Sequence, residues 1–388
     1  MPRRTAWSAE ALEERVAFLA ERGADLPHLT GASPLPDPAE LRGNIEHFVG
    51  MTQIPTGLIG PLRIRGTHAS GDFYVPLATS EGALVASYDR GARLISQAGG
   101  AVCLTTAAQL QRAPGFVFAS VGEAARFALW AAGQTELFRA AVAGCTAYGR
   151  LLDVAIQVEA NRVYVVCSFH TGDAAGQNMV TFCTAAICED ILARTPVAPE
   201  HWLLESNLSG DKKARTLSLM HPRGRQVSAE TVLPAALVRR FLRTTPERMC
   251  DAWRMGFVAG VQSGAIGGGG HIANGIAALF MACGQDVACV SEAAVGIMRM
   301  EMRGPDLGCT VTLPNLIVGT VGGGTRLPTA RECLRILGCE GEGGAGRFAE
   351  ICAATVLGGE ISIVGAMSAG EFASAHRRLG RRPAPRAP

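Results

Sequence analysis

Residues 151–168 read Leu151-Leu-Asp-Val-Ala-Ile-Gln-Val-Glu-Ala-Asn-Arg-Val-Tyr-Val-Val-Cys-Ser168, and they predict two neighbouring β-strands, at 151–158 and 162–168. They lie within a segment, 98–196, in which strand and helix patterns follow one another. The other elements expected there are a strand at 115–120 and helices at 121–132 and 177–193. No G-x-G-x-x-G follows a strand, so a Rossmann fold is not indicated. An antiparallel sheet with helices on one face is favoured, which makes the fold class α+β.

The chain on either side of this segment predicts different structure. Residues 8–23 have the pattern of an amphipathic helix with Ser8 as its N-cap. Beyond the segment, long apolar helices alternate with glycine-rich turns at 264–270, 319–324 and 341–346. A length of 388 residues is enough for two or three domains with ample core.

The composition is that of a well-buried soluble protein. Hydrophobic residues make up 48% of the chain, and the net charge of +2 offers no global field for nucleic acid or membrane. The 12 cysteines include no CxxC pair and no spacing typical of a zinc site, which indicates a reducing cytoplasm and no metal centre. The longest apolar stretch identified, 275–284, is far short of the roughly 20 residues that span a bilayer. We expect a soluble, cytoplasmic protein with no membrane segment and no nucleic-acid partner.

Only two of the 36 basic residues are lysines, and these two, Lys212 and Lys213, are adjacent. They end the stretch Glu205-Ser-Asn-Leu-Ser-Gly-Asp-Lys-Lys. Arginine can replace a lysine that supplies charge alone, but it cannot replace a compact ammonium whose pKa must be adjustable. Two leftover surface lysines would rarely be neighbours, so a chemical role is favoured over that alternative.

Two carboxylates stand out by their apolar surroundings. Glu81 precedes a run of small and apolar residues, and two interpretations remain open. It is either a buried acid whose raised pKa holds a proton for catalysis, or a helix N-terminal carboxylate. Asp286 lies in the most apolar part of the chain, where a carboxylate almost always has a partner, and lysine is the fitting one. Upstream, His271 and Asn274 are three residues apart and therefore share one helical face.

The stretch Thr171-Gly-Asp-Ala-Ala-Gly-Gln-Asn joins a predicted strand to a predicted helix. Its backbone amides can face a pyrophosphate or a carboxamide, while an ordinary helix-capping loop is the competing interpretation. The chain shows no serine or cysteine nucleophile motif and no metal cluster. A lysine for an oxyanion, an acid for protons and a coupling aspartate favour hydride addition to a carbonyl over covalent catalysis.

Six motifs are specific enough to indicate a family. They are Ile54-Pro-Thr-Gly-Leu-Ile-Gly-Pro-Leu, Ala78-Thr-Ser-Glu-Gly, Asp211-Lys-Lys, Ala282-Cys-Gly-Gln-Asp, Thr312-Leu-Pro-Asn-Leu-Ile-Val-Gly-Thr-Val-Gly-Gly-Gly-Thr and Ala366-Met-Ser-Ala-Gly. In order and spacing they resemble the 3-hydroxy-3-methylglutaryl-coenzyme A reductases of eukaryotes, archaea and some bacteria. The resemblance runs from about residue 45 to residue 376, and no membrane anchor precedes it, as is usual for prokaryotic members.

The resemblance implies an oxidoreductase of isoprenoid synthesis. Such enzymes reduce hydroxymethylglutaryl-CoA to mevalonate and CoA with two hydrides from NAD(P)H. Lys212 would stabilise the oxyanion, and Glu81 would be the protonated acid. Asp286 would tune both, and His376 would protonate the departing thiolate. A divergent reductase of another acyl-CoA and a non-catalytic binding protein on the same scaffold remain as alternatives.

The resemblance also implies ligand-binding residues. It favours NADPH over NADH and implies no metal, although Ala147 stands where some NADPH-using members carry an arginine. The residues implied in binding hydroxymethylglutaryl-CoA are Ser87, Arg93, Arg112, Asp211, Lys213, Arg243, His271 and Asn274. Those implied in binding the cofactor are Asp173, Ala174, Ala175, Gly176, Gln177, Asn178 and Arg223.

The domain organisation expected from the resemblance has a small domain inserted into a larger one. A ferredoxin-like NAD(P)-binding domain (94–202) interrupts a large α/β substrate-binding domain built around a long central helix (51–93 and 214–388). A helical region (1–50) precedes them, and a loop carrying the two lysines (203–213) connects the domains. Family members are homodimers or homotetramers with active sites at the dimer interface, so the same assembly is expected here.

The chain departs from the family pattern near its expected site. Glu205 begins a stretch that usually reads Ser-Gly-Asn, and an added carboxylate would repel a substrate carboxylate unless a cation compensates it. Glu371 replaces a common histidine, and Arg243 replaces a lysine that usually meets CoA. Ala175 and Gln177 stand where methionines are usual, so different nicotinamide packing is expected.

Overall fold

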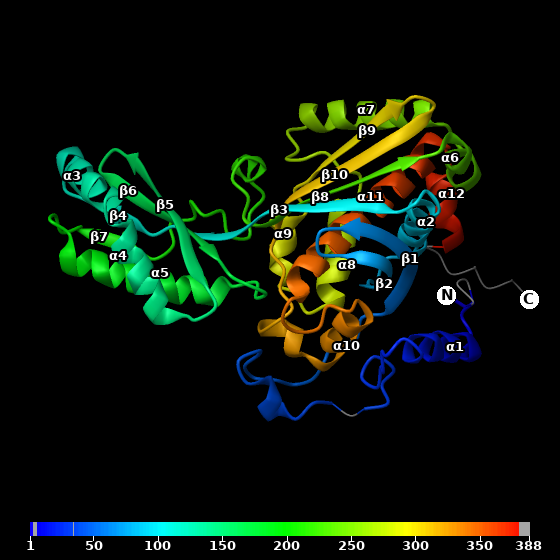
Figure 1. Ribbon diagram of the computed structural model, residues 1–388, viewed down its shortest axis with the longest axis horizontal. Coiled ribbons are helices and arrows are strands. Elements are labelled where there is room, and N and C mark those ends of the chain that lie inside the picture. The colour runs from blue at the N-terminus through cyan, green and yellow to red at the C-terminus, as the bar shows by residue number, and fades with distance from the viewer. Residues whose placement is uncertain (3–5, 34, 380–388) are drawn as a thin grey trace, which may run out of the picture.

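A 25-residue helix, α11 (Gly344–Ser368), runs through the centre of the larger of two lobes in the computed structural model (Figure 1). The structure describes residues 1–2, 6–33 and 35–379. Almost every residue of α11 is buried, which is the setting expected of a helix that is apolar all round.

The expectation that 275–284 is the longest apolar stretch is wrong. Within the described residues α11 is long and apolar enough to cross a membrane, with a mean hydropathy of 1.6, but 83% of that stretch is buried in the protein. Burial on this scale is what the core helix of a globular lobe shows, and the position of α11 in Figure 1 agrees with it.

The strands of both lobes form one connected set. They are β1 (Thr56–Gly66), β2 (Ser70–Ala78), β3 (Ala101–Arg112), β4 (Gly115–Val117), β5 (Arg150–Glu159), β6 (Arg162–His170), β7 (His201–Leu203), β8 (Gly224–Leu233), β9 (Ile297–Arg303) and β10 (Asp306–Leu316). Their order is β7-β4-β6-β3-β8-β10-β9, with β1 beside β3, β2 beside β1 and β5 beside β6. Among the paired strands of the described residues, only β1 and β3 run parallel. The mixed helix and antiparallel-sheet class predicted from the sequence is therefore confirmed.

Strand β3 belongs to both lobes. Residues 102–109 pair with β8 in the larger lobe, and residues 110–112 pair with β6 in the smaller one. Figure 1 shows this strand running from one lobe into the other. The two lobes are thus joined through a hydrogen-bonded strand.

The smaller lobe contains the predicted strand pair. β5 and β6 pair antiparallel from Arg150 opposite His170 to Glu159 opposite Arg162. Helices α3 (Val121–Ala132), α4 (Thr135–Cys145) and α5 (Gln177–Arg194) complete the lobe, and α4 is an element that the sequence did not predict. Side chains that alternate along β6, such as Val163 and Val165, are buried, which leaves the opposite face of the sheet more open.

The larger lobe also contains most of the helices. They are α2 (Leu84–Gln97), α6 (Ala235–Leu242), α7 (Pro246–Gln262), α8 (Ile272–Ala282), α9 (Val290–Ala293), α10 (Pro328–Ile336), α11 and α12 (Phe372–Leu379), with short 3₁₀ helices η1 (Pro38–Leu41), η2 (Thr216–Leu219), η3 (Val287–Cys289) and η4 (Gly323–Arg326). Helix α11 contacts β1, β3, β8 and β10 on its sheet side, and α2 and α8 on its other sides.

The N-terminal segment packs on this lobe. Helix α1 (Ala9–Ala20) begins after the predicted cap, and the Ser8 hydroxyl accepts a hydrogen bond from the Ala11 N–H at 3.3 Å. The chain then reaches α10, where the buried Glu332 carboxylate accepts the backbone N–H groups of His28 and Leu29, both at 2.8 Å. A buried carboxylate thus fixes a loop through the loop's backbone, and this pattern recurs elsewhere in the molecule.

Two glycines allow α2 and α11 to cross closely. A Cβ on Gly91 would lie 1.9 Å from the carbonyl oxygen of Gly358, and a backbone atom cannot move aside as a flexible side chain can. The helices can therefore pack backbone to backbone only because position 91 has no side chain.

We expect Gly91→Ala to lower the free energy of unfolding by about 1–3 kcal/mol, because the added methyl must separate the two helices. Gly256→Ala on α7 is the matched control, since no atom lies within 4 Å of its added Cβ. The control should be neutral or slightly stabilising, because alanine favours helix. Urea denaturation of both variants measures the difference, and equal stabilities would contradict the close crossing.

Candidate active site

Lys212 lies on the loop between β7 and β8 and contacts a carboxylate from a distant part of the chain. Its Nζ lies 2.7 Å from Oδ2 of Asp286, the residue that caps η3. The hydrogen bond to Asp286 raises the pKa of the Lys212 ammonium, which is therefore charged at neutral pH. The lysine partner expected for Asp286 is present. The two side chains are 41% and 40% exposed, so the pair is open to a ligand, whereas the sequence suggested a buried aspartate.

Asp211 is held by two buried arginines. Oδ2 accepts from Nη1 of Arg112 at 3.0 Å, and Oδ1 accepts from Nη2 of Arg223 at 2.7 Å. Burial alone would raise the pKa of Asp211, but Arg223 and Arg112 more than offset it, so that pKa lies below its usual value. Arg223, expected beside the cofactor, is fully buried, and its Nη1 donates to Glu292 at 2.6 Å. The structure thus gives Arg223 a different setting from the one expected.

The chain itself compensates the unusual carboxylate at Glu205. Oε2 of Glu205 lies 3.3 Å from Nη1 of Arg112 and accepts the Ser209 hydroxyl at 3.0 Å. Oε1 accepts the backbone N–H of Asn207 at 2.7 Å. Glu205 therefore braces the loop that leads to Asp211 instead of standing free to repel a substrate.

Lys213 turns back onto its own loop. Its Nζ donates to Oδ1 of Asn207 at 3.1 Å and to the backbone oxygen of Asp211 at 3.0 Å. The two adjacent lysines therefore have different partners, because Lys212 reaches across to another segment and Lys213 does not.

Glu81 lies outside the helix that follows it. It is exposed, and α2 begins only at Leu84, so neither the buried acid nor the helix N-terminal carboxylate describes it in this chain. Oε2 of Glu81 accepts from Nδ2 of Asn274 at 2.9 Å. Among the described residues, no hydrogen bond or ion pair joins Glu81 to Lys212 or Asp286.

His271, the residue before α8, contacts the buried Tyr88 and the buried Glu360. Its ring packs on Tyr88 with centroids 4.8 Å apart, and its Nε2 lies 2.9 Å from the carbonyl oxygen of Gly359. Burial lowers the pKa of His271, which favours the neutral ring. Its backbone N–H donates to the buried Glu360 carboxylate at 2.6 Å. This arrangement fixes the start of α8, where Asn274 lies.

Ser87 and Arg93, the two residues of α2 expected to bind substrate, contact different helices. The Ser87 hydroxyl is 2.9 Å from that of Ser362 on α11. The Arg93 side chain is 42% exposed, and its guanidinium lies over the Phe241 ring at 5.8 Å. Arg93 is therefore partly open to solvent.

The expected cofactor loop packs on the larger lobe. The Asp173 carboxylate accepts two backbone N–H groups at the N-terminus of α11, at 2.8 and 3.1 Å, and so caps the central helix. Ala174 and Ala175 lie against Gly319, where an added Cβ would come within 2.4 Å of the Ala175 nitrogen. The backbone of this loop can therefore lie close to position 319 because residue 319 has no side chain.

The end of the same loop adjoins the lysine–aspartate pair. Gly176, with φ of 81°, precedes α5, and as a glycine it has no side chain with which to cap that helix. Gln177 opens α5, and its Nε2 lies 3.4 Å from Oδ2 of Asp286 and 2.9 Å from Sγ of Cys289. Asn178 follows in the first turn. A helix N-terminus without a side-chain cap suits an anionic group.

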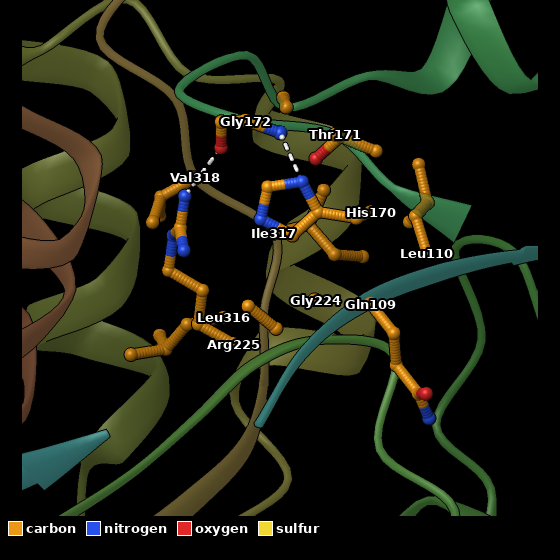
Figure 2. A pocket seen from close by; sticks show the side chains of 12 residues that line it. Gln109, Leu110, His170, Thr171, Gly172, Gly224, Arg225, Leu316, Ile317 and Val318 are labelled. Atoms are coloured by element: carbon orange, nitrogen blue, oxygen red, sulfur yellow. Dashed lines mark hydrogen bonds between the residues drawn. The ribbon is translucent and has the colours of Figure 1, made fainter. Parts of the chain in front are cut away.

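A small pocket between the lobes adjoins this loop. Figure 2 shows Arg225 reaching from β8 to the carbonyl oxygen of Gly172, at 2.6 Å, while the Gly172 N–H donates to Nδ1 of His170 at 3.3 Å. Burial lowers the pKa of His170, and the nearby Arg150 and Arg225 add to this. These contacts tie the loop expected to bind the cofactor to β8.

The model of the hydroxymethylglutaryl-coenzyme A reductase family matches residues 11–381. The chain belongs to this family.

Archaeal reductases are similar to it over most of their length. It is 43% identical to the 3-hydroxy-3-methylglutaryl-coenzyme A reductase of Aeropyrum pernix, over 96% of this chain and 89% of that one. It is 41% identical to the reductase of Methanothermobacter thermautotrophicus, over 96% and 94%. A class II reductase of Streptococcus pneumoniae, solved with NADPH in open conformations, shares the fold with a TM-score of 0.70 at 17% identity, over 92% and 96%.

Two departures from the reductase pattern meet near the C-terminus. Nη1 of Arg243 lies 2.8 Å from Oε1 of Glu371, the residue before α12. Position 376 falls on α12, but the side chain of His376 lies outside the described residues. In the described part of this reductase, no group of three or more His, Cys, Asp or Glu side chains gathers as metal ligands.

Sequence reasoning missed Glu292, which lies six residues after Asp286. It is 1% exposed and accepts both Arg223 and the backbone N–H of Lys212. The observation that could have found it is the one that singled out Asp286, an acid within an apolar run.

The lowered pKa of Asp211 predicts a pH-dependent stability. The ionised form is stabilised by folding, so its contribution is full above the usual pKa of 3.8 and is lost as pH falls through the lower folded value. Asp211→Asn should therefore reduce stability between pH 5 and 8, and the difference from wild type should shrink below pH 3.8. Thermal unfolding across this range tests it, with the exposed Asp251→Asn as control; a difference that does not change with pH would contradict it.

Proposed function

We propose that this chain reduces hydroxymethylglutaryl-CoA to mevalonate and CoA with two hydrides from NADPH, at a site centred on Lys212. Membership of the reductase family supports the reaction. The observation that carries the proposed site is the pair formed by Lys212 and Asp286 at 2.7 Å, beside the N-terminus of α5.

Lys212 has the properties of an oxyanion-stabilising group. Its raised pKa keeps the ammonium charged, so it acts as a cation and not as a base. Asp286 fixes the direction of Nζ and leaves two of its three N–H donors for a substrate oxygen. Lys212 therefore faces negative charge that develops on the thioester carbonyl, and later on the aldehyde carbonyl.

The residues of the small lobe fit an anionic dinucleotide. The first N–H groups of α5 lack a side-chain cap, and Gly176 in the left-handed region leaves the approach to them free of a Cβ. NADPH, when bound there, would supply the hydrides. Gln177 contacts both this helix end and Asp286, so the loop that would hold the cofactor borders the charged pair.

The geometry of α8 separates the proposed acid from the proposed cation within one chain. Glu81 is bonded to Asn274 in the first turn of α8, whereas Asp286 follows the last turn. The eight residues from Asn274 to Ala282 rise about 12 Å along the helix axis. A complete site therefore needs Glu81 from a second copy of the chain, which supports a homodimer with shared active sites.

A spectrophotometric assay of NADPH oxidation tests the activity. Purified protein should oxidise two molecules of NADPH for each hydroxymethylglutaryl-CoA consumed, and the same assay with NADH compares the cofactors. Lys212→Arg should be slower on the order of 100-fold or more, because the larger planar cation cannot take the place of the ammonium. Lys213→Arg is the comparison variant: because Lys213 bonds to its own loop and not to Asp286, its replacement should lower the turnover number much less. Absence of nucleotide oxidation by the wild type would refute the proposal.

A mixed dimer tests the shared site. Glu81→Gln and Lys212→Ala should each be nearly inactive alone. A heterodimer purified through two different tags should recover about half of the wild-type rate, because one of its two active sites then carries both intact residues. If Glu81 and Lys212 of the same chain worked together, both sites of the heterodimer would be defective and no activity would return.

A further inference from the structure

One short segment of the chain contacts both the side chain and the backbone of Lys212. Asp286, before η3, receives its Nζ at 2.7 Å, and Glu292, in α9, accepts its backbone N–H at 2.9 Å. The two carboxylates are six residues apart, so the segment 286–292 contacts both the functional group and the backbone of the same lysine.

Glu292 is anchored in turn by a buried arginine. The Glu292 side chain is 1% exposed and that of Arg223 is fully buried, and they meet at 2.6 Å. The other Nη of Arg223 donates to Asp211 at 2.7 Å. Asn315 adds to the anchor, since its Oδ1 accepts the Arg223 N–H and its Nδ2 donates to the backbone oxygen of Glu292. One buried ion pair thus fixes the side chain of residue 211 and the backbone of residue 212.

The backbone of Lys212 requires such an anchor. Its φ of 55° lies in the left-handed region, which residues other than glycine adopt only at a cost. The direction in which its side chain leaves the loop depends on this conformation. Without the acceptor at Glu292, the loop would relax toward ordinary φ values and Nζ would turn away from Asp286.

We infer that Glu292, supported by Arg223, is a positioning residue that holds Lys212 in the left-handed conformation and thereby aims its ammonium at the reacting carbonyl. The catalytic meaning of this aim rests on the proposed function. The hold on the lysine does not, because it concerns only contacts within the chain.

The presence of only two lysines makes the inference measurable without substrate. Reductive methylation with ¹³C-formaldehyde labels Lys212, Lys213 and the α-amine, and dimethyl-lysine keeps its charge and can be titrated by NMR. Lys212→Arg and Lys213→Arg assign the two side-chain signals. In the wild type, the Lys212 signal should titrate at higher pH than an isolated lysine, because of its bond to Asp286.

Removing the acceptor should release Lys212. In Glu292→Ala, and in Glu292→Asp, whose carboxylate is one methylene shorter, the Lys212 signal should titrate at lower pH than in the wild type, while that of Lys213 should not move. Glu292→Gln keeps an acceptor oxygen in place and should restore part of the wild-type titration. Glu332→Ala is the matched control, because Glu332 is likewise a buried acceptor of backbone N–H groups, but the two groups that it accepts lie in the N-terminal segment.

The kinetic expectation follows the same order. In Glu292→Asp, kcat should fall by about 10- to 100-fold through misplacement of Lys212, with the KM for NADPH unchanged within about twofold.

A folded Glu292→Ala or Glu292→Asp variant with the wild-type Lys212 titration would overturn the inference, as would a lowered melting temperature with unchanged titration and kcat. If Glu292→Ala does not fold, Glu292→Asp decides. A wild type without turnover would refute the proposed function, while the titration would still decide the inference.

Discussion

The burial of α11 on every face is the constraint on which the rest of the structure depends. A buried polar group without a partner costs about 1–3 kcal/mol, so the two buried glutamates of this helix must find donors. Glu350 accepts two backbone N–H groups of the β1–β2 turn, and Glu360 accepts those of Gly270 and His271. The same contacts that satisfy the helix therefore also fix one loop at each glutamate, and one of these loops begins α8.

The proposed active site repeats this arrangement. Glu360 fixes the backbone from which Asn274 projects, and Glu292 fixes the backbone of Lys212. Burial raises the pKa of both carboxyl groups, and hydrogen bonds from the backbone, together with Arg223 at Glu292, work in the opposite direction. Reactive side chains can thus remain exposed to a ligand while their backbones are held from the protein interior. A ligand can then reach these side chains while their orientation stays fixed, and catalysis needs both.

The sequence predicted those features whose cause is local. The strand pair β5–β6, the Ser8 cap and the beginnings of α3 and α5 depend on neighbouring residues, and they lie where the patterns indicated. The lysine partner of Asp286 could also be predicted, because an apolar setting demands an opposite charge and the chain offers few lysines.

The features that could not be predicted depend on contacts between distant segments. The exposure of Glu81 follows from where β2 and α8 come together, and the burial of Arg223 follows from Asp211 and Glu292, which are 81 positions apart in the sequence. The sequence of α11 does not read as one apolar segment because charged residues interrupt the run, and only the fold shows that two of them are buried and hydrogen-bonded.

The continuity of β3 has a mechanical consequence. A strand that is hydrogen-bonded to β8 on one side of the junction and to β6 on the other cannot serve as a free pivot, because rotating one lobe would have to break ladder bonds. Its most yielding point is the irregularity between Thr105 and Ala107, which lies within the larger lobe and not at the boundary. The lobes are therefore coupled through β3, and a rotation of one lobe against the other would have to bend this strand.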